Sequence, residues 1–382
     1  MLQFEQLSYW EKSTLLEGID FLVIGSGIVG SACALQLHED NPKAKIVLLE
    51  RGYISTGAST KNAGFACFGS VTELADDLLT MSESDVWKTV DMRWRGLQRL
   101  TERFNPEEIG LSFRGSWDLI DHSELSGKPA LDDQIAGFNE RIKEITGHAD
   151  CFSYDADIAR RCGFKGIHGG YFNRLEGELH TGKLFLATEK LLAAAGVICL
   201  NGIEVTALQP SEKEVIVQTT FGELKAAKVA VTVNGFAQKL LGDQRIVPAR
   251  AQVLVTNEIP GFGLPGTFHY RKGYYYFRSI NNRLLLGGGR NLDFKGETST
   301  ELQTTSPILS ALKTLVSETI LPGKDVRIDY EWAGIMGVGT EKKPIVELIH
   351  PNVGIAVRMG GMGVAIGSLA GEELAGQLTM NK

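Results

Sequence analysis

The hydrophobic pattern of the chain is clearest near its start, where two short apolar runs enclose a glycine-rich turn. Residues 20–24 (DFLVI) and 45–50 (KIVLLE) are typical of buried parallel strands, which are nearly continuous in apolar residues. Residues 31–37 lie between them and are predicted to form a helix with small residues on one face. The pattern therefore predicts one β-α-β unit of about 30 residues.

Comparable segments recur towards the other end of the chain. The expected helices are 184–195 and 363–378, and the expected strands are 197–200, 215–220, 223–233 and 353–357. Residues 273–287 alternate in the manner of a hairpin that turns at Asn281–Asn282. Residues 75–145 are charged and helix-like.

A parallel α/β pattern at both ends with a β-rich middle predicts the α/β fold class. The expected architecture is a discontinuous Rossmann-like domain for a dinucleotide, combined with an α+β substrate domain built on an antiparallel sheet. The first domain is expected to comprise residues 1–80, 150–240 and 330–382. The substrate-binding domain is expected to comprise residues 81–149 and 241–329.

Composition narrows the function. The chain has 382 residues, a formal net charge of −7 and 43% hydrophobic residues, which excludes a disordered chain and argues against a nucleic-acid partner. Its 44 glycines exceed the roughly 27 expected from average usage, so specific turns must require them.

The cysteines and histidines give no sign of a metal site. Five scattered cysteines without a C-x-x-C pair predict neither a disulfide framework nor a zinc ribbon, and they favour a reducing, cytoplasmic location. The seven histidines lack metal-ligand spacing. No apolar run is long enough for a transmembrane segment, and no signal peptide is expected at the N-terminus.

The glycine-rich turn Gly25–Gly30 has the spacing G-x-G-x-x-G of a dinucleotide-binding fingerprint. Gly25 permits the tight turn, Gly27 lets the backbone approach a pyrophosphate, and Gly30 lets helix and strand pack closely. Glu50 ends the second strand, where its carboxylate can accept both ribose hydroxyls and would repel a 2′-phosphate. A glycine-rich turn of some other α/β protein is the alternative.

A second glycine cluster, 358–364 (RMGGMGV), joins the last strand to the last helix. The N-terminus of that helix could point at the same ligand and stabilise the negative charge of a reduced flavin. A glycine cluster that only packs a helix on a sheet is the alternative.

With these motifs the chain resembles the D-amino-acid oxidase superfamily of FAD-dependent amine oxidoreductases. It is most similar to the glycine oxidase, sarcosine oxidase and γ-glutamylputrescine oxidase branches. The resemblance rests on residues 8–11 (SYWE), the fingerprint through 50–52 (ERG), 57–64 (GASTKNAG), 232–235 (TVNG), 332–334 (WAG) and the Gly360 cluster.

The resemblance implies a set of residues that contact FAD, in which Asn234 departs from an Ala-Gly pair of the family. The implied residues are Gly25, Ser26, Gly27, Ile28, Val29, Gly30, Glu50, Arg51, Ser59, Thr60, Asn62, Ala63, Gly64, Val205, Asn234, Gly235, Gly360, Gly361, Met362, Gly363 and Val364. Monomeric sarcosine oxidases attach FAD through a cysteine in the segment after the insert. No cysteine follows Cys199 here, so the FAD is expected to be non-covalent.

The resemblance also implies the reaction: a small-molecule amine or amino acid passes a hydride to flavin N5, and the electrons go on to oxygen or another acceptor. Three alternatives stay open, namely a 2-hydroxy-acid dehydrogenase of the same superfamily, a non-catalytic FAD-binding subunit, and a plain NAD dehydrogenase. The oligomeric state is not indicated.

The residues around the substrate are less certain. Glycine-oxidising relatives place an arginine two residues after Trp-Ala-Gly to clamp the carboxylate, and Met336 occupies that position here. Arg278 and Arg290 are the candidate replacements, and alternation places Tyr274 and Tyr276 on the same strand face as Arg278. Aromatic residues that serve packing alone are the alternative.

A cation near flavin N5 would speed the reaction with oxygen by stabilising superoxide. Lys61 replaces an arginine of some relatives at this point, and Lys343 is the other candidate. The catalytic residues expected on the substrate or oxygen side are therefore Lys61, Tyr276 and Arg278. Ordinary solvated lysines are the alternative for both lysines.

Overall fold

The computed structural model describes residues 4–380, and one of its two large sheets is built around β1 (Ile19–Ile24). β1 lies between β2 (Ile46–Glu50) and β11 (Glu223–Val231) and is parallel to both. The other strands of this sheet are β8 (Ile198–Asn201), β9 (Val205–Pro210), β10 (Val215–Thr219), β17 (Ile345–His350) and β18 (Val353–Val357). The order is β17-β18-β11-β1-β2-β8, with β10 and β9 extending antiparallel from β11.

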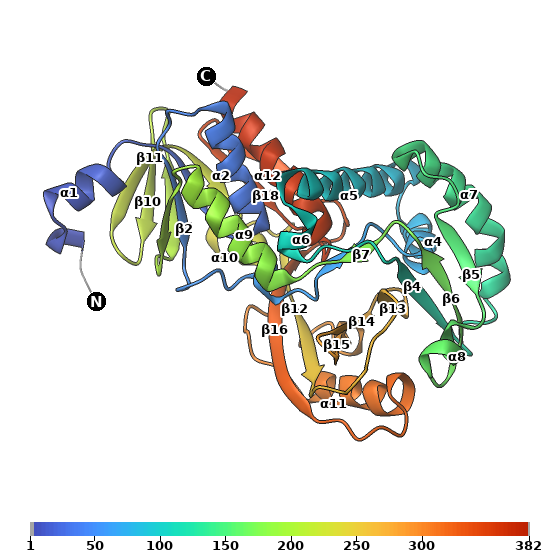
Figure 1. Ribbon diagram of the computed structural model, residues 1–382. Helices are drawn as coiled ribbons and strands as arrows, with labels where there is room; N and C mark the ends of the chain where they lie inside the picture. Colours follow the sequence, from blue (N-terminus) through green and yellow to red (C-terminus); the bar gives the residue numbers. More distant parts are fainter. Residues whose placement is uncertain (1–3, 381–382) are drawn as a thin grey trace.

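Two helices from opposite ends of the chain cover one face of this sheet. α2 (Ile28–Asp40) and α12 (Gly363–Met380) lie side by side in Figure 1, where the first is blue and the second red. Alternate strand residues such as Val23 and Leu48 share a buried cluster with Cys33 of α2 and Leu374 of α12. The predicted β-α-β unit and the predicted last strand and helix are confirmed.

The second large sheet combines strands from residues 116–338. They are β4 (Ser116–Asp121), β5 (Phe152–Asp155), β6 (Ile167–Asn173), β12 (Val247–Thr256), β13 (Thr267–Tyr270), β14 (Tyr275–Ile280), β15 (Arg283–Gly288) and β16 (Ile328–Val338). Their order is β16-β12-β15-β14-β13-β4-β6-β5. β5 and β6 thus join this sheet, although the expected division placed residues 150–240 with the first domain, because β6 pairs with β4. Residues 1–3 and 381–382 of that division lie outside the described residues.

The hairpin of the second sheet forms as the sequence predicts. β14 and β15 pair antiparallel and turn at Asn281 and Asn282, whose φ angles are 48° and 58°. Two central residues with positive φ are the signature of a type I′ turn, which matches the twist of the flanking strands. α11 (Ser306–Leu315) covers one face of the sheet, packing Ile308 and Leu312 against Leu254 and Leu286.

Residues 75–145 are mainly helical, as expected, and connect the two halves of the molecule. α4 (Val71–Thr80), α5 (Glu83–Arg103) and α7 (Lys128–Thr146) form this layer, and α5 runs from beside α12 towards α7 in Figure 1. β4 interrupts the helices, because its six residues are buried between β13 and β6. The smaller elements are α1 (Tyr9–Glu11), α3 (Ala58–Lys61), β3 (Phe65–Ala66), α6 (Pro106–Ile109), α8 (Ile158–Cys162), β7 (Gly177–Glu178), α9 (Thr181–Ala194) and α10 (Ala237–Leu241).

Candidate active site

A cavity of about 730 Å³ lies where the two large sheets meet. It is lined by the ends of β1, β2 and β9, by the start of α2, by residues 57–63, and by residues 359–365 before and within α12. Strands β12 to β16 supply the opposite wall. Such a volume is ordinary for a ligand site, and both predicted glycine turns open into this one cavity.

The first glycine turn brings backbone to the cavity with no side chain in between. Gly25 has a φ of 101°, which a residue with a Cβ rarely adopts. A Cβ at Gly27 would lie 2.7 Å from Ser59 Oγ, and a Cβ at Gly30 would lie 1.9 Å from the Gly25 carbonyl oxygen. Ile28 N donates to Ser59 Oγ at 2.9 Å, which joins the start of α2 to α3. The N-terminus of α2 is therefore open to an anionic group.

Glu50 stands at the end of β2, lines the cavity and is only 7% exposed. Its Oε2 accepts from Ser26 Oγ at 3.0 Å, and its Oε1 accepts from Gly52 N at 2.9 Å. Oε2 also accepts from Ser26 N at 3.4 Å, whereas Oε1 keeps a second lone pair, with which Glu50 can accept a hydrogen bond from a ribose hydroxyl. Arg51 stacks on the ring of Phe236, 3.7 Å from its centroid.

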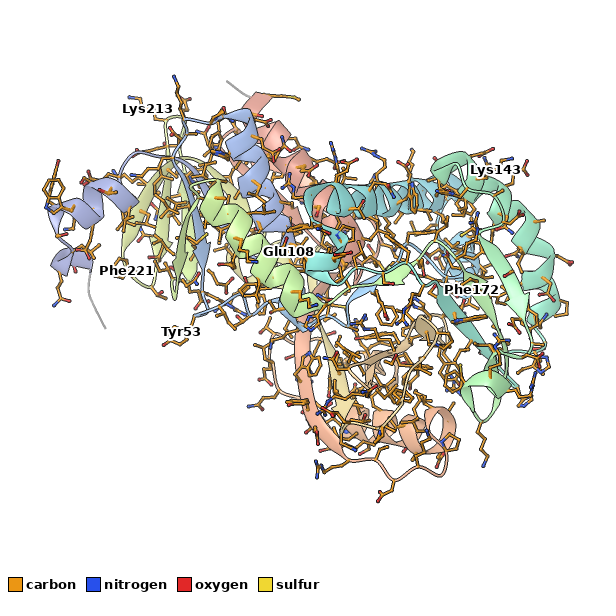
Figure 2. All side chains as sticks on the ribbon, in the orientation of Figure 1. Tyr53, Glu108, Lys143, Phe172, Lys213 and Phe221 are labelled. Carbon is orange, nitrogen blue, oxygen red and sulfur yellow. The ribbon has the colours of Figure 1, made fainter. Side chains whose placement is uncertain are left out.

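The end of the cavity near Glu50 and Arg51 reaches the protein surface. Glu204, Val205 and Lys239 line it, and the side chain of Lys239 is 82% exposed. Tyr53, in the loop after β2, projects away from the molecule in Figure 2 and is 88% exposed. The arrangement suits the adenosine half of a dinucleotide, whose far edge can remain in water.

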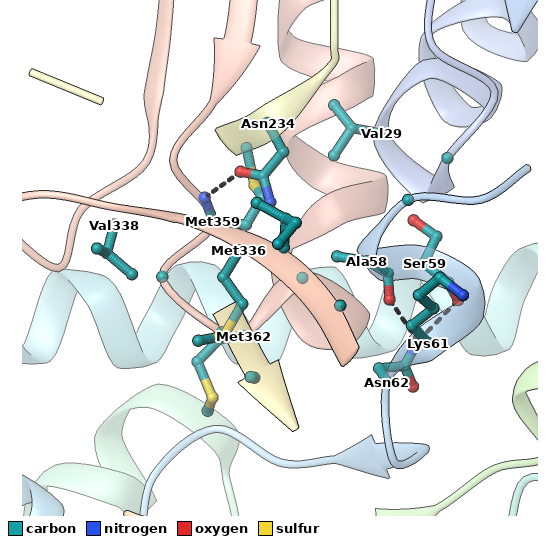
Figure 3. A pocket seen from close by; sticks show the side chains of 18 of the residues that line it. Val29, Ala58, Ser59, Lys61, Asn62, Asn234, Met336, Val338, Met359 and Met362 are labelled. Carbon is teal, nitrogen blue, oxygen red and sulfur yellow. Dashed lines mark hydrogen bonds between the residues drawn. The ribbon is translucent and has the colours of Figure 1, made fainter. Parts of the chain in front are cut away.

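The second glycine turn is tied to the middle of the chain by Asn234. Its Oδ1 accepts from Arg358 N at 3.1 Å and from Met359 N at 3.2 Å, and Figure 3 draws this connection. Gly360 and Gly361 follow with φ angles of 60° and 86°. The asparagine that departs from the family pattern therefore positions the turn before α12.

Most of the residues expected to contact FAD line this cavity. They are Gly25, Gly27, Ile28, Val29, Glu50, Arg51, Ser59, Asn62, Ala63, Val205, Asn234, Gly360, Gly361, Met362, Gly363 and Val364. Five others lie behind this lining. They are Ser26, Gly30, Thr60, Gly64 and Gly235.

Those five residues support the lining instead. Ser26 holds Glu50, and Thr60 Oγ1 donates to the Ser55 carbonyl at 2.8 Å. A Cβ at Gly235 would lie 2.4 Å from the Met336 carbonyl oxygen, so this glycine permits close packing on β16.

One face of the second sheet forms the opposite wall. Val253, Gly287, Tyr276 and His269 lie opposite one another in a row across β12, β15, β14 and β13. A Cβ at Gly287 would lie 2.4 Å from the Tyr276 ring, so the glycine makes room for it. Burial raises the pKa of Tyr276 to about 12, which keeps its hydroxyl a donor. Burial lowers the pKa of His269, which favours its neutral form.

Arg278 does not line the cavity, contrary to the role expected for it. It projects from the same strand face as Tyr276, but its guanidinium passes on to β7. Its Nη1 lies 3.3 Å from Glu178 Oε2, and its Nη2 donates to the Leu179 carbonyl at 2.9 Å. Arg278 is 4% exposed, so this buried ion pair occupies the group that a substrate would need.

The two candidate lysines differ in position. Lys61 lines the cavity at the end of α3, and its carbonyl accepts from Trp332 Nε1 at 2.9 Å. A Cβ at Gly334 would lie 3.0 Å from Lys61 Cβ, so the Trp-Ala-Gly segment both holds this lysine and makes room for it. Lys343 is not part of the lining, and its carbonyl accepts from Arg358 Nε at 2.9 Å.

Sequence reasoning missed a charged group at the mouth of the cavity. Glu73 and Asp76 of α4 line it together with Lys342 and Lys272. Lys272 Nζ lies 2.6 Å from Asp76 Oδ1, and Lys342 Nζ lies 3.7 Å from Glu73 Oε1. Burial alone would raise the pKa of Glu73, but Arg93 and Lys342 outweigh it and hold the pKa low. No local motif marks these residues, since only tertiary packing brings them together.

The chain is similar in sequence to known oxidoreductases. The chain is 22% identical to a probable oxidoreductase OrdL of Haemophilus influenzae, over 95% of this chain and 83% of that protein. It is 25% identical to the γ-glutamylputrescine oxidoreductase of Escherichia coli, over 96% of this chain and 85% of that protein.

Solved structures share the fold. The L-proline dehydrogenase of P. horikoshii superposes with a TM-score of 0.75 at 17% identity, covering 96% of this chain and 95% of that one. The glycine oxidase of Geobacillus kaustophilus gives a TM-score of 0.74 at 17% identity, covering 95% of each chain. Within residues 4–380, no helix is both long enough and apolar enough to cross a membrane.

The residues of the cavity fit FAD. Two glycine turns bring backbone to the wall of one cavity, and the buried carboxylate of Glu50 lines the same cavity beside the first turn. Residues 20–377 match the family described as FAD dependent oxidoreductase, known as DAO. The chain therefore belongs to this family of enzymes, and FAD is its cofactor.

Proposed function

We propose that this protein oxidises the C–N bond of an amine or amino acid at its bound FAD. One observation carries the proposal: both glycine turns and one face of the β12–β16 sheet line the same cavity. A substrate held on that sheet face would lie against the cofactor. The named activities of the relatives, oxidation of γ-glutamylputrescine, sarcosine, proline and glycine among them, support an amine as the reacting group.

FAD, when bound, would supply the acceptor for a hydride, that is one proton and two electrons, from the carbon next to nitrogen. The substrate also loses one N–H proton, and the resulting imine adds water and splits into a carbonyl compound and an amine. His269 lines the cavity in a setting that favours the neutral imidazole, so it can accept a proton from an ammonium group and free the nitrogen lone pair. Tyr276 can donate a hydrogen bond from the same wall.

Lys61 is the proposed cation on the oxygen side, because it lines the cavity beside the FAD-binding residues of α3. A cytoplasmic location belongs to the proposal too, on the ground that all five cysteines are free thiols.

An anaerobic screen of the FAD-loaded protein tests the proposal. Amines and amino acids should bleach the flavin absorbance and release one amine for each flavin reduced, whereas free FAD should not react. Bleaching by 2-hydroxy acids alone would replace amine oxidation with oxidation of a C–OH bond. Mixing the reduced protein with oxygen gives a second measurement, in which Lys61→Met should slow reoxidation by about a hundredfold without slowing reduction.

A further inference from the structure

Arg290 lines the cavity without a partner for its charge. It follows the turn Gly288–Gly289, and Gly289 N donates to the Tyr274 carbonyl at 2.9 Å. Its guanidinium carbon lies 4.9 Å from the centroid of the Phe294 ring. Its Nε is buried and makes no hydrogen bond with any described residue. The arginine is therefore fixed by the turn and the ring, while its polar atoms stay unused.

Two other cations of the cavity, Lys272 and Lys342, are paired with acids, and Arg290 is not. Lys272 pairs with Asp76, and Lys342 pairs with Asp77 and Glu73. Of the acids that follow Arg290, Asp293 accepts from Gly296 N at 2.8 Å, and Glu297 is bound at 2.9 and 3.0 Å by Arg250. No carboxylate of residues 4–380 lies within 4.0 Å of the Arg290 guanidinium. Burial lowers the pKa of Arg290, and an anionic ligand would offset this unfavourable desolvation.

The Arg290 guanidinium is on a different strand from position 336, where glycine-oxidising relatives carry their carboxylate-binding arginine. Met336 is in β16, and its thioether packs on the second glycine turn, 3.4 Å from where a Cβ of Gly361 would lie. Gly288 lies opposite Gln252, which lies opposite Ala333. β15 is thus two strand spacings from β16, which is about 10 Å. A carboxylate next to the reacting carbon would meet Met336, whereas a remote one could reach Arg290.

The strand between β15 and β16 is β12, and it contributes the apolar Ala251 and Val253 to the cavity. Tyr276 and Phe65 continue this apolar surface beyond β15, with ring centroids 5.7 Å apart. Such a surface favours a hydrocarbon segment over charged groups.

We propose that Arg290 binds a substrate carboxylate that an apolar spacer separates from the oxidised C–N bond. The substrate class is then an amine with a remote carboxylate, not a simple α-amino acid. The inference rests on the proposed function, since it names the substrate of the same site.

The test compares amines that differ in the distance to a carboxylate. Glycine, γ-aminobutyrate, ε-aminocaproate and hexylamine are mixed anaerobically with the FAD-loaded wild type, Arg290→Gln, Arg290→Lys and Arg160→Gln. Arg160 is an exposed residue of α8 and serves as the matched control. Calorimetry with hexanoate and acetate, which carry no amine to oxidise, measures carboxylate binding separately.

In the wild type, ε-aminocaproate should reduce the flavin at lower concentrations than glycine or hexylamine. Arg290→Gln should weaken the binding of ε-aminocaproate and of hexanoate by about ten- to a hundredfold, the effect of losing a hydrogen bond to a charged group. Arg290→Lys should recover part of the affinity, and the flavin content of all variants should equal that of Arg160→Gln.

Equal binding of hexanoate by Arg290→Gln and Arg160→Gln would overturn the inference, and so would a preference for glycine over the longer substrates. The proposed function fails separately. If no amine bleaches the flavin but hexanoate binding still depends on Arg290, the carboxylate site stands and amine oxidation falls. If amines bleach the flavin and Arg290→Gln needs no more ε-aminocaproate than Arg160→Gln does, amine oxidation stands and the carboxylate site falls.

Discussion

Gly27 and Gly30 share one turn, but a side chain at each would meet a different kind of neighbour. A Cβ at Gly27 would press on Ser59 Oγ, the end of a side chain that can rotate. A Cβ at Gly30 would press on the backbone oxygen of Gly25 and lie 2.5 Å from Thr232 Oγ1. A side chain at Gly27 would therefore displace Ser59 in the cavity wall, whereas one at Gly30 would disturb the packing of the fold.

Gly27→Val should fold and lose FAD, because the new methyl groups occupy the approach to the phosphates. Gly30→Ala should instead lower the free energy of unfolding by about 1–3 kcal/mol, the usual range for overpacking. The measurements are the FAD content after desalting and the urea unfolding of both apoproteins. A fully loaded Gly27→Val protein would show that the phosphates lie elsewhere.

At the scale of elements, α12 is held by close approaches to two other helices. A Cβ at Gly371 would lie 2.3 Å from the Val29 carbonyl oxygen of α2. A Cβ at Gly96 of α5 would lie 2.0 Å from the Ala365 carbonyl oxygen of α12. The backbones can approach this closely only because glycine has no side chain, and the approach sets where α12 begins at the cavity.

Two glycines of α12 give a matched pair of variants. Gly371→Ala should destabilise the protein by about 1–3 kcal/mol, because the new methyl group meets the backbone of α2. Gly376→Ala should be neutral or stabilise by up to about 1 kcal/mol, since nothing lies within 4 Å of a Cβ there and alanine favours a helix. Urea unfolding followed by circular dichroism measures both. Equal stabilities would contradict the close α2–α12 packing.

At the scale of the whole molecule, two buried carboxyl groups make stability depend on pH. Glu176 accepts from Phe68 N at 2.7 Å, and Asp118 accepts from Thr72 N at 2.7 Å. Burial raises the pKa of each to about 7, and the hydrogen bonds only partly oppose it. The folded state then holds protons that the unfolded state releases near its ordinary carboxyl pKa. The stabilisation that these two groups contribute is therefore fully present below that value and is lost as the pH rises through about 7.

Glu176→Gln should remove part of this loss. At pH 5 the variant should be about as stable as the wild type, and at pH 8 it should be more stable by an amount on the order of 1–3 kcal/mol. Asp118 still titrates, so a slope remains. Thermal unfolding at both pH values measures the effect, with Glu212→Gln as an exposed control. An identical pH dependence in wild type and Glu176→Gln would place the titration elsewhere.

Sequence reasoning succeeded where the signal is local and failed where it depends on distant segments. The turn Gly25–Gly30 and the Asn281–Asn282 hairpin are encoded within a few neighbouring residues, and both were predicted correctly. The alternation of residues along the strand also predicted the face from which Arg278 projects. It could not predict the ion pair of Arg278 with Glu178, because Glu178 lies a hundred positions earlier in the sequence. Glu73 of α4 was missed for the same reason, since nothing near it in sequence marks a cavity.

The two glycine turns come from opposite ends of the chain, and residues 232–234 join them from the middle. Thr232 Oγ1 donates to the Gly25 carbonyl at 3.1 Å, and Asn234 Oδ1 accepts from Arg358 N at 3.1 Å. A chain cut short before Gly360 would keep the first turn and Glu50 but would lose the second turn, so it should hold the coenzyme more weakly than the intact chain.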